Sequence, residues 1–396
     1  MKHIDRVRRR FLGLMLLSAL FLTACGDSVD HATSGEQTTG FQTATTISTT
    51  QTEGEITLTS SEFTVTPKTV RFIGRHHVDA QTVAYGFYNV AAGVTFAFTG
   101  TSLELELSAT AYQEHNLNYV AVTIDDREPI AVCVEKDGWY PIADDLEEGV
   151  RHTVKVLKRT MSNAGAVYIK RVRLSDGAQL YTVPVTTKHR IQVLGDSITC
   201  GYGTLWDGSD TEEVTKWQDG ANSYAVMTAE RLNAELQVIA ISGIGVGNAE
   251  NKPYALLPHY MQEDMFNNID CDFTAYVPEV VVIALGTNDV GQGNPPDTFK
   301  ANAARMIRFI REKYPDAVIV WTYGVMGSAS YTGVIREMVE KLNAQGETNL
   351  YFLPMEPSYP DEPIGQHGHP GQKTHERMAD QLTTFLCGIT GWTDVG

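Results

Sequence analysis

Between residues 61 and 186, apolar and polar residues alternate with a period of two, the pattern of strands that bury one face. Turn-forming pairs such as Asp125-Asp126 and Asp137-Gly138 separate the alternating stretches, and no helical pattern lies between them. In chain order, the predicted strands are VTFAFTG, SLELELSA, YVAVTID, IAVCVEK, HTVKVLKR and VYIKRVRL. Short strands at this spacing favour an N-terminal all-β sandwich of the jelly-roll type over residues 61–186.

From residue 187 onward, apolar strands alternate with amphipathic helices. The predicted strands are IQVLG, LQVIAIS, EVVVIALG, AVIVWTYG and LYFLP, and the predicted helices are ANSYAVMTAERLNAE, FKANAARMIRFIREKY, IREMVEKLNAQ and THERMADQLTTFL. Because such strands are apolar on both faces, residues 187–396 favour a C-terminal α/β/α domain, a flavodoxin-like parallel sheet covered by helices. Ligands of such sheets bind beyond the carboxyl ends of the strands.

The first 60 residues follow neither pattern. Residues 1–24 have a basic start and an apolar run too short for a membrane span, as in a signal peptide. The next residue is Cys25, and the stretch LTAC resembles the lipobox of bacterial lipoproteins, which implies cleavage before Cys25 and acylation of its thiol. A plain secretory signal with an incidental cysteine is the alternative. Residues 25–60 are rich in Ser and Thr and predict a disordered tether.

The charge and the cysteine content of the chain argue against one class of partner and two kinds of motif. The formal net charge of −17 would repel phosphate backbones, which argues against nucleic acid as a partner. Besides Cys25, the chain has four cysteines, for which the sequence allows three pairings. They are Cys133, Cys200, Cys271 and Cys387. None forms a C-x-x-C pair, so neither a zinc ribbon nor a thioredoxin-like motif is indicated.

Four short polar stretches follow the predicted strands or precede the last helix. They are Gly195-Asp196-Ser197, Ser242-Gly243, Gly286-Thr287-Asn288-Asp289 and His369-Pro370. Each alone is an ordinary turn or cap sequence, but a parallel sheet would bring all four to one edge. There, His369 would act as the base that activates the hydroxyl of Ser197. The N–H groups of Ser197 and Gly243 and the side-chain amide of Asn288 would form an oxyanion hole.

These four stretches resemble the SGNH, or GDSL-type, hydrolases, because GDSITCGYG and GTND are similar to two sequence blocks of that superfamily. With the preceding sandwich, which contains FTGTSLELEL, the chain looks most like carbohydrate esterase family two. That resemblance implies a jelly roll joined to an SGNH domain, removal of O-acetyl groups from polysaccharides such as xylan and glucomannan, and no cofactor or metal. It also implies the roles given above for Ser197, Gly243, Asn288 and His369.

The chain departs from the SGNH pattern in one place. Such enzymes usually carry an aspartate two or three residues before the catalytic histidine, where this chain has His367 and Gln366. Three alternatives remain open at this point. His369 donates to a backbone carbonyl and forms a dyad with Ser197, or Asp361 or Glu362 supplies the acid, or turnover has been lost.

Other residues have weaker claims to function. His367, His369 and His375 lack the spacing of a zinc site, and Cys200 is expected to be a packed or disulfide-bonded thiol. Trp206 and Trp217 either stack on a sugar ring or pack in the protein.

The sequence therefore predicts an exported lipoprotein, anchored to a membrane by its lipid, that deacetylates carbohydrate polymers. A lipid or aryl esterase on the same scaffold and a non-catalytic carbohydrate-binding lipoprotein are the rival interpretations.

Overall fold

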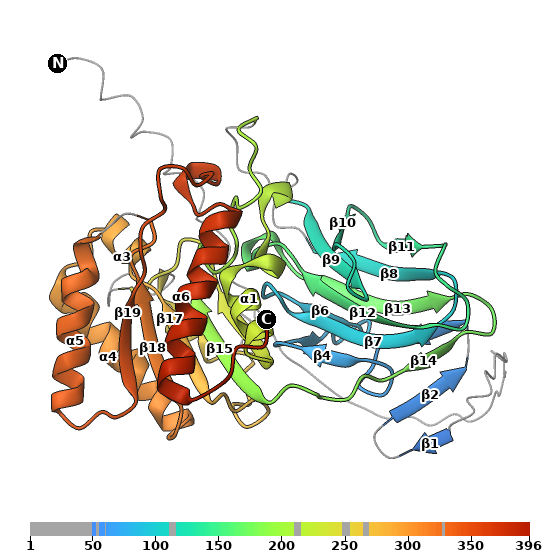
Figure 1. Ribbon diagram of the computed structural model, residues 1–396, viewed down its shortest axis with the longest axis horizontal. Coiled ribbons are helices and arrows are strands. Elements are labelled where there is room, and N and C mark those ends of the chain that lie inside the picture. Colours follow the sequence, from blue (N-terminus) through green and yellow to red (C-terminus); the bar gives the residue numbers. More distant parts are fainter. Residues whose placement is uncertain are drawn as a thin grey trace, which may run out of the picture. The chain divides into compact units, whose positions relative to one another are not determined.

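The computed structural model describes residues 50–52, 55–59, 61–110, 116–209, 215–247, 254–263, 269–326 and 329–396, with the backbone alone for residues 50–59 (Figure 1). The predicted signal peptide, Cys25 and the larger part of the predicted tether lie outside these residues. Within them, no helix is both long enough and apolar enough to span a bilayer.

The sandwich consists of two sheets whose paired strands are all antiparallel. Among the described residues, the first sheet has the order β1-β2-β14-β7-β12-β9-β10, with β4 also paired to β7. Its strands are β1 (Thr50–Thr52), β2 (Glu55–Thr59), β4 (Arg71–Ile73), β7 (Gly93–Thr99), β9 (Asn118–Ile124), β10 (Ile130–Val134), β12 (Arg151–Lys158) and β14 (Gln179–Tyr181). The second sheet has the order β11-β8-β13-β6-β5, with β3 paired to β13. Its strands are β3 (Glu62–Thr64), β5 (His77–Val78), β6 (Tyr85–Phe87), β8 (Leu103–Ala109), β11 (Gly138–Ala143) and β13 (Val167–Leu174).

The six predicted strands of the sandwich correspond to β7, β8, β9, β10, β12 and β13, and the antiparallel fold is confirmed. The predicted tether is wrong at its end, because β1 and β2 lie before residue 60 and β2 pairs with β14. Pairing at a sheet edge uses backbone groups, and threonine favours strands, so a polar composition does not prevent it.

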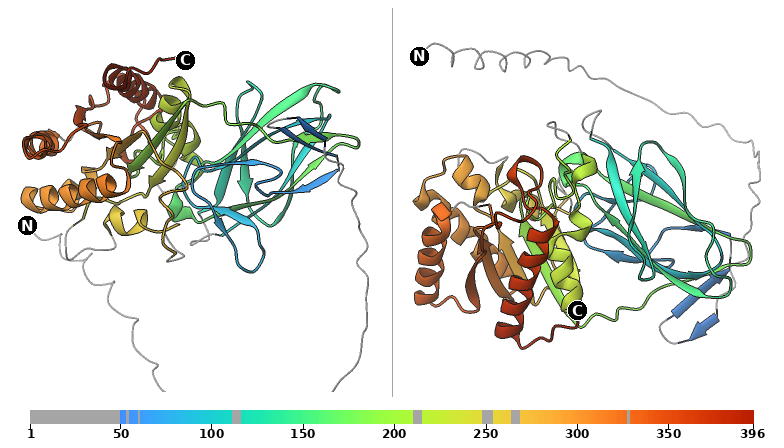
Figure 2. Two further views of the ribbon diagram at one scale, coloured as in Figure 1. Left: turned by 90° about the horizontal axis from the view of Figure 1, so that it is seen from below. Right: turned by 45° about the horizontal axis from the view of Figure 1, so that its top comes forward.

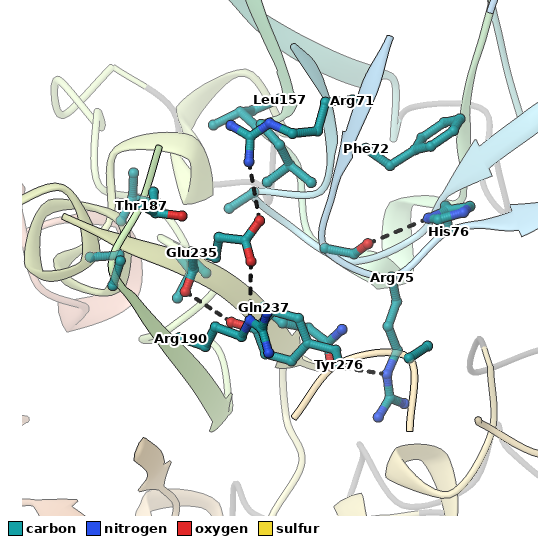
Figure 3. Close-up of a pocket in the computed structure, with 18 of the residues that line it drawn as sticks. Arg71, Phe72, Arg75, His76, Leu157, Thr187, Arg190, Glu235, Gln237 and Tyr276 are labelled. Carbon is teal, nitrogen blue, oxygen red and sulfur yellow. Dashed lines mark hydrogen bonds and ion pairs between the residues drawn. The ribbon is translucent and has the colours of Figure 1, made fainter. Parts of the chain in front are cut away.

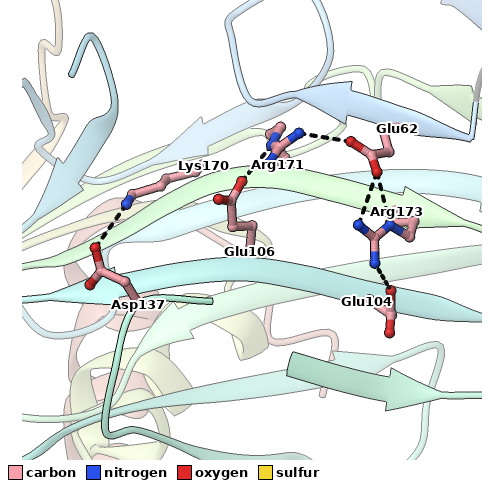
Figure 4. A network of polar contacts seen from close by, with 7 residues as sticks. All are labelled: Glu62, Glu104, Glu106, Asp137, Lys170, Arg171 and Arg173. Carbon is pink, nitrogen blue, oxygen red and sulfur yellow. Dashed lines mark hydrogen bonds and ion pairs between the residues drawn. The ribbon is translucent and has the colours of Figure 1, made fainter. Parts of the chain in front are cut away.

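Strand β8 shows how alternation builds the sandwich. Its three leucines are fully buried in the core between the sheets, while Glu104 and Glu106 alternate with them and are part-exposed. On this outer face, Arg173 donates to Glu104 at 2.6 Å and Arg171 donates to Glu106 at 2.5 Å (Figure 4). The outer face is thus covered by ion pairs across neighbouring strands.

The C-terminal domain is built on a parallel sheet of order β16-β15-β17-β18-β19 within the described part of the chain. Its strands are β15 (His189–Gly195), β16 (Ala234–Ala240), β17 (Val280–Ala284), β18 (Val318–Tyr323) and β19 (Leu350–Pro354). Its helices are α1 (Tyr224–Arg231), α2 (Leu256–Tyr260), α3 (Thr287–Gly291), α4 (Pro296–Lys313), α5 (Thr332–Ala344) and α6 (Gln372–Thr390). All five predicted strands and all four predicted helices are present, and α2 and α3 are additional.

Helices cover both faces of this sheet (Figures 1 and 2). On one face α1 and α6 pack together and contribute to one apolar core, and on the other face α2, α4 and α5 contribute to a second. The central strand β17 is buried on both faces except at its last residue, which is why its sequence is an unbroken apolar run. The α/β/α prediction is confirmed.

Several polar side chains join the sandwich to the α/β domain. Arg75 follows β4, is buried, and donates through Nη1 to the carbonyls of Tyr260 and Gln262, each at 2.8 Å. Ser162, after β12, donates to the carbonyl of Ala240 at 2.8 Å, at the carboxyl end of β16. The sandwich therefore contacts the sheet at the end where ligands of parallel sheets bind.

Candidate active site

Ser197 lies two residues beyond the carboxyl end of β15, in a tight turn. The N–H of Ile198 donates to the carboxylate of Asp196 at 3.0 Å, and Ser197 is 5 % exposed. A Cβ at Gly195 would lie 2.0 Å from the hydroxyl oxygen of Thr199, so only glycine lets the turn fold this closely. The turn places the serine at the sheet edge predicted from the sequence.

His369 reaches Ser197 from the loop before α6. Its Nε2 lies 2.8 Å from the Ser197 Oγ, and its Nδ1 lies 3.1 Å from the carbonyl oxygen of Gln366. Because a carbonyl can only accept a hydrogen bond, Nδ1 carries the proton and Nε2 accepts the hydrogen of the serine hydroxyl. This is the tautomer that a general base needs.

The imidazole of His369 is held in its neutral form. Burial lowers its pKa to about 4, against a smaller opposing effect from the Gln366 carbonyl. At neutral pH the ring is therefore a free base beside the hydroxyl of Ser197.

The structure distinguishes the candidates for the orienting group. The carboxylate of Glu362 binds Arg377 Nε at 2.8 Å and the Thr374 hydroxyl at 2.8 Å. The bond to Arg377 holds the pKa of this carboxyl at about 2, and Asp361 is exposed. The Gln366 carbonyl, not either of these acids, occupies the hydrogen-bonding position at Nδ1 of His369.

Asn288 lies in the first turn of α3, beyond the end of β17. Its Nδ2 donates to the carbonyl of Ile244 at 2.8 Å and to the carboxyl of Asp196 at 3.3 Å, so it lies beside the serine turn. Burial raises the pKa of Asp196 to about 7, and the charge of Asp289 adds to the rise.

Gly243 lies in the loop that follows β16. At the start of this loop, the N–H of Ile241 donates to the carbonyl of Gly195, just before the serine turn, at 3.2 Å. Gly243 has a φ of +83°, a left-handed conformation that favours glycine. Its carbonyl accepts a hydrogen bond from the side chain of Gln292 at 3.2 Å.

Asp289 stabilises the same glycine-rich loop. Its carboxylate accepts from the N–H groups of Val246 and Gly247, both at 3.0 Å, and from the Asn294 side chain at 2.9 Å. These contacts make Asp289 a residue that stabilises the loop.

The remaining sequence candidates lie as follows. Trp206 and Trp217 are part-buried, and the ammonium of Lys216 lies 4.3 Å from the centre of the Trp217 ring.

The four described cysteines are free, and Cys200 is fully buried with its thiol pKa raised by burial. Cys200 is thus a packed thiol and is not in a disulfide.

Tyr202 and Asn163 also lie at the site, and neither was predicted from the sequence. The Tyr202 ring packs against His369 with ring centres 4.4 Å apart, and its hydroxyl lies 2.9 Å from His367 Nδ1. Asn163, from the sandwich, is exposed and donates to the Ser242 carbonyl at 3.5 Å. Tyr202 stands in the quoted motif and could have been considered, whereas no local signal connects Asn163 to a site in another domain.

A cavity of about 500 Å³ lies elsewhere, between β4 and the amino ends of β15 and β16 (Figure 3). Glu235 in its wall pairs with Arg71 at 3.1 Å and with Arg190 at 3.4 Å. Neither Ser197 nor His369 lines it. This cavity is therefore not the candidate active site, which is identified by the pairing of Ser197 with His369.

Comparison with known proteins covers both domains. Residues 193–384 match the GDSL-like Lipase/Acylhydrolase family, and residues 72–184 match the Carbohydrate esterase 2 N-terminal domain. Among curated proteins, the chain is 33% identical over 261 residues to the Cellulase/esterase CelE of Acetivibrio thermocellus. That match covers 63% of this chain but only 31% of CelE. An Acetylxylan esterase / glucomannan deacetylase of Cellvibrio japonicus is 26% identical over 334 residues, covering 82% of this chain and 89% of that protein.

Among solved structures, a family two carbohydrate esterase from Clostridium thermocellum in complex with cellohexaose superposes with a TM-score of 0.74. The two are 26% identical, and the match covers 82% of this chain and 99% of that chain. The acetyl xylan esterase Est2A from Butyrivibrio proteoclasticus, at 20% identity and a TM-score of 0.74, shares the fold.

Proposed function

The chain belongs to the GDSL-type hydrolases with the domain arrangement of carbohydrate esterase family two, and from this premise we propose that it is a carbohydrate O-acetylesterase acting through an acetylated serine. The observation that carries the proposal is the 2.8 Å contact between His369 Nε2 and Ser197 Oγ, with Nδ1 on a carbonyl. A neutral imidazole in this position accepts the proton that the serine must lose.

In the first half of the reaction, His369 Nε2 takes the proton of the Ser197 hydroxyl as Oγ attacks the acetyl carbonyl carbon. The resulting oxyanion is stabilised by the side-chain amide of Asn288 and the N–H groups of Ser197 and Gly243. When the intermediate collapses, the sugar oxygen leaves and takes the proton from the imidazolium, and the acetyl group stays on Oγ.

In the second half, a water molecule gives a proton to His369 Nε2 and attacks the acetyl carbon. The bond to Ser197 Oγ breaks, and the imidazolium returns its proton to that oxygen. The product leaves as acetic acid, which keeps the second proton of the water and loses it to solvent to become acetate. In both halves, the Asn288 amide must turn one hydrogen from its resting acceptors, the Ile244 carbonyl and the Asp196 carboxyl, to the oxyanion.

Acetylated polysaccharides are the proposed substrates, by analogy with the relatives named acetylxylan esterase / glucomannan deacetylase. Asn163 and Gln292 support this, because both are exposed amides that contact the Ser242-Gly243 loop and can hydrogen-bond sugar hydroxyls. Trp206 and Trp217 are proposed to stack on sugar rings.

The proposed location is the outside of a bacterial membrane, either periplasmic or on the cell surface, with a lipid on Cys25 as the anchor. The basic and apolar leader and the LTAC stretch support this location.

The test is acetate release from acetylated xylan and acetylated glucomannan by the wild-type protein and Ser197→Ala. We expect Ser197→Ala to lose activity by at least about a thousandfold, because the nucleophile is gone. Ser61→Ala, an exposed serine of the sandwich, is the matched control and should keep full activity. Equal acetate release by Ser197→Ala and the wild type would refute the proposal.

The same proteins, assayed on 4-nitrophenyl acetate and octanoate, separate a sugar acetylesterase from a lipid esterase. We expect preference for acetate, and a preference for octanoate would favour the lipid or aryl esterase.

A further inference from the structure

The carbonyl that orients His369 belongs to a strained turn. Residues Gln366–Gly368 form a short 3-10 turn in which His367 has φ 56° and ψ 30°. A residue with a Cβ rarely adopts this left-handed conformation, so another contact must hold it. The strain matters to the site because the φ of His367 sets the plane of the Gln366–His367 peptide, and hence the direction of the Gln366 carbonyl.

The segment Tyr202-Gly203 contacts this turn in several places. The Tyr202 hydroxyl lies 2.9 Å from His367 Nδ1, and the Gly203 carbonyl accepts from the N–H of Gln366 at 3.0 Å. Tyr202 is 6 % exposed, and its own N–H donates to the Ser197 carbonyl at 3.0 Å. The tyrosine is therefore fixed to the serine turn while its ring and hydroxyl contact both histidines.

We propose that Tyr202 and His367 are positioning residues whose hydrogen bond holds the left-handed turn, so that the Gln366 carbonyl stays on His369 Nδ1. Neutral groups then orient the base at the place where related hydrolases use a carboxylate. The inference rests on the proposed function, because it concerns the same serine and histidine.

Two substitutions of His367 separate this role from a direct one. His367→Ala and His367→Gly both remove the imidazole, but only glycine adopts the left-handed conformation without strain. We expect His367→Ala to lower kcat about tenfold with little change in KM. A loss of this size corresponds to the free-energy penalty of a left-handed conformation on an alanine. His367→Gly should stay within about threefold of the wild-type kcat, because glycine lacks that penalty. His367 is exposed, so both variants are expected to fold.

Tyr202→Phe tests the other partner, since it keeps the ring on His369 and removes the hydroxyl. We expect its kcat to fall about tenfold, comparable with the loss in His367→Ala, because both release the same turn. In the double variant Tyr202→Phe/His367→Gly, the loss should be much smaller than in Tyr202→Phe alone.

Equal losses in His367→Ala and His367→Gly would overturn the proposal, because the imidazole itself would then matter. Wild-type kcat in both variants would overturn it as well. If Ser197→Ala is inactive in the same assay, either result refutes the positioning role of Tyr202 and His367 but does not contradict the proposed function. Acetate release by Ser197→Ala equal to the wild type would instead remove the proposed function.

Discussion

His369 combines two features that act on its basicity in opposite directions. Burial disfavours the imidazolium, and the Gln366 carbonyl stabilises it only as a dipole, without the charge that a carboxylate would supply. The first effect is larger, so the pKa of His369 falls to about 4. The ring stays neutral and available as a base under conditions in which an exposed histidine would be protonated.

This pKa predicts the acid side of the pH profile. Activity requires the neutral ring, so kcat/KM should stay level as the pH falls through 6.5, the ordinary histidine value, and decline only toward about pH 4. Initial rates on 4-nitrophenyl acetate, measured from about pH 3.5 to about pH 8, cover the range in which histidines titrate. They would give the midpoint of the decline in kcat/KM. A midpoint at the ordinary histidine value would contradict the burial argument.

Folding stability needs a separate control in that experiment. His375 is fully buried, and burial lowers its pKa to about 4 as well. The unfolded chain binds protons on both histidines at a higher pH than the folded chain does, so stability falls as the pH drops from 6.5 toward 4. Circular dichroism at each pH would separate unfolding from titration of the active site.

At the scale of the elements, the loops after β15, β16 and β17 determine the site. Gly195 is required because a Cβ there would overlap the Thr199 side chain, whereas a Cβ at Gly243 would meet no atom of the described residues within 4 Å. Gly243 is instead constrained by its φ of +83°. The two glycines thus serve different physical purposes in neighbouring loops.

Gly243→Ala is therefore predicted to reduce activity without disturbing the fold. A left-handed alanine costs about 1–2 kcal/mol, so the loop would spend about 5- to 30-fold less time in its present conformation, and kcat should fall accordingly. Acetate release and thermal unfolding would be measured together.

Gly333→Ala is the matched control, because an added Cβ there also meets no atom within 4 Å in the part of the chain that the structure describes, but the residue lies in helix α5. We expect it to keep full activity and to gain up to about 1 kcal/mol of stability. Full activity in Gly243→Ala as well would show that the loop conformation is not needed.

The long elements were predictable from local pattern, and the short ones were not. Strand β17 is an unbroken apolar run, and helices α4 and α6 carry a strong helical periodicity. Both are local signals that do not depend on which segments pack around them. Strands of two or three residues, such as β4 and β5, are held by pairing with distant strands and leave no periodic signal. Strand β2 lay in a segment whose composition indicated disorder, yet it pairs with β14.

At the scale of the molecule, the sandwich and the α/β domain share contacts near the candidate site. Ser162 and Asn163 reach the end of β16 and the following loop from the sandwich, and buried Arg75 binds two carbonyls near α2. The sandwich thus contributes polar groups to the edge of the proposed substrate site.

The proposed anchor makes a prediction for the whole protein in a bacterial host. Wild-type protein should incorporate a labelled fatty acid and sediment with membranes, because a lipid on Cys25 would hold it there. Cys25→Ser should lose the label, while Cys387→Ser, a free cysteine of α6, should keep it. Labelling of Cys25→Ser at the wild-type level would place the lipid elsewhere or refute the anchor.

The sequence alone determined the two-domain architecture and the identity of the candidate chemical groups, because alternation and apolar runs report locally on burial. It also showed that an aspartate was absent from its usual place before His369. Only the tertiary structure decided what replaces it. The Gln366 carbonyl binds His369 locally, three residues away, but Tyr202 meets the left-handed His367 across 165 residues of sequence and Ser197 meets His369 across 172. Such contacts depend on distances in the folded chain, which no local pattern of residues records.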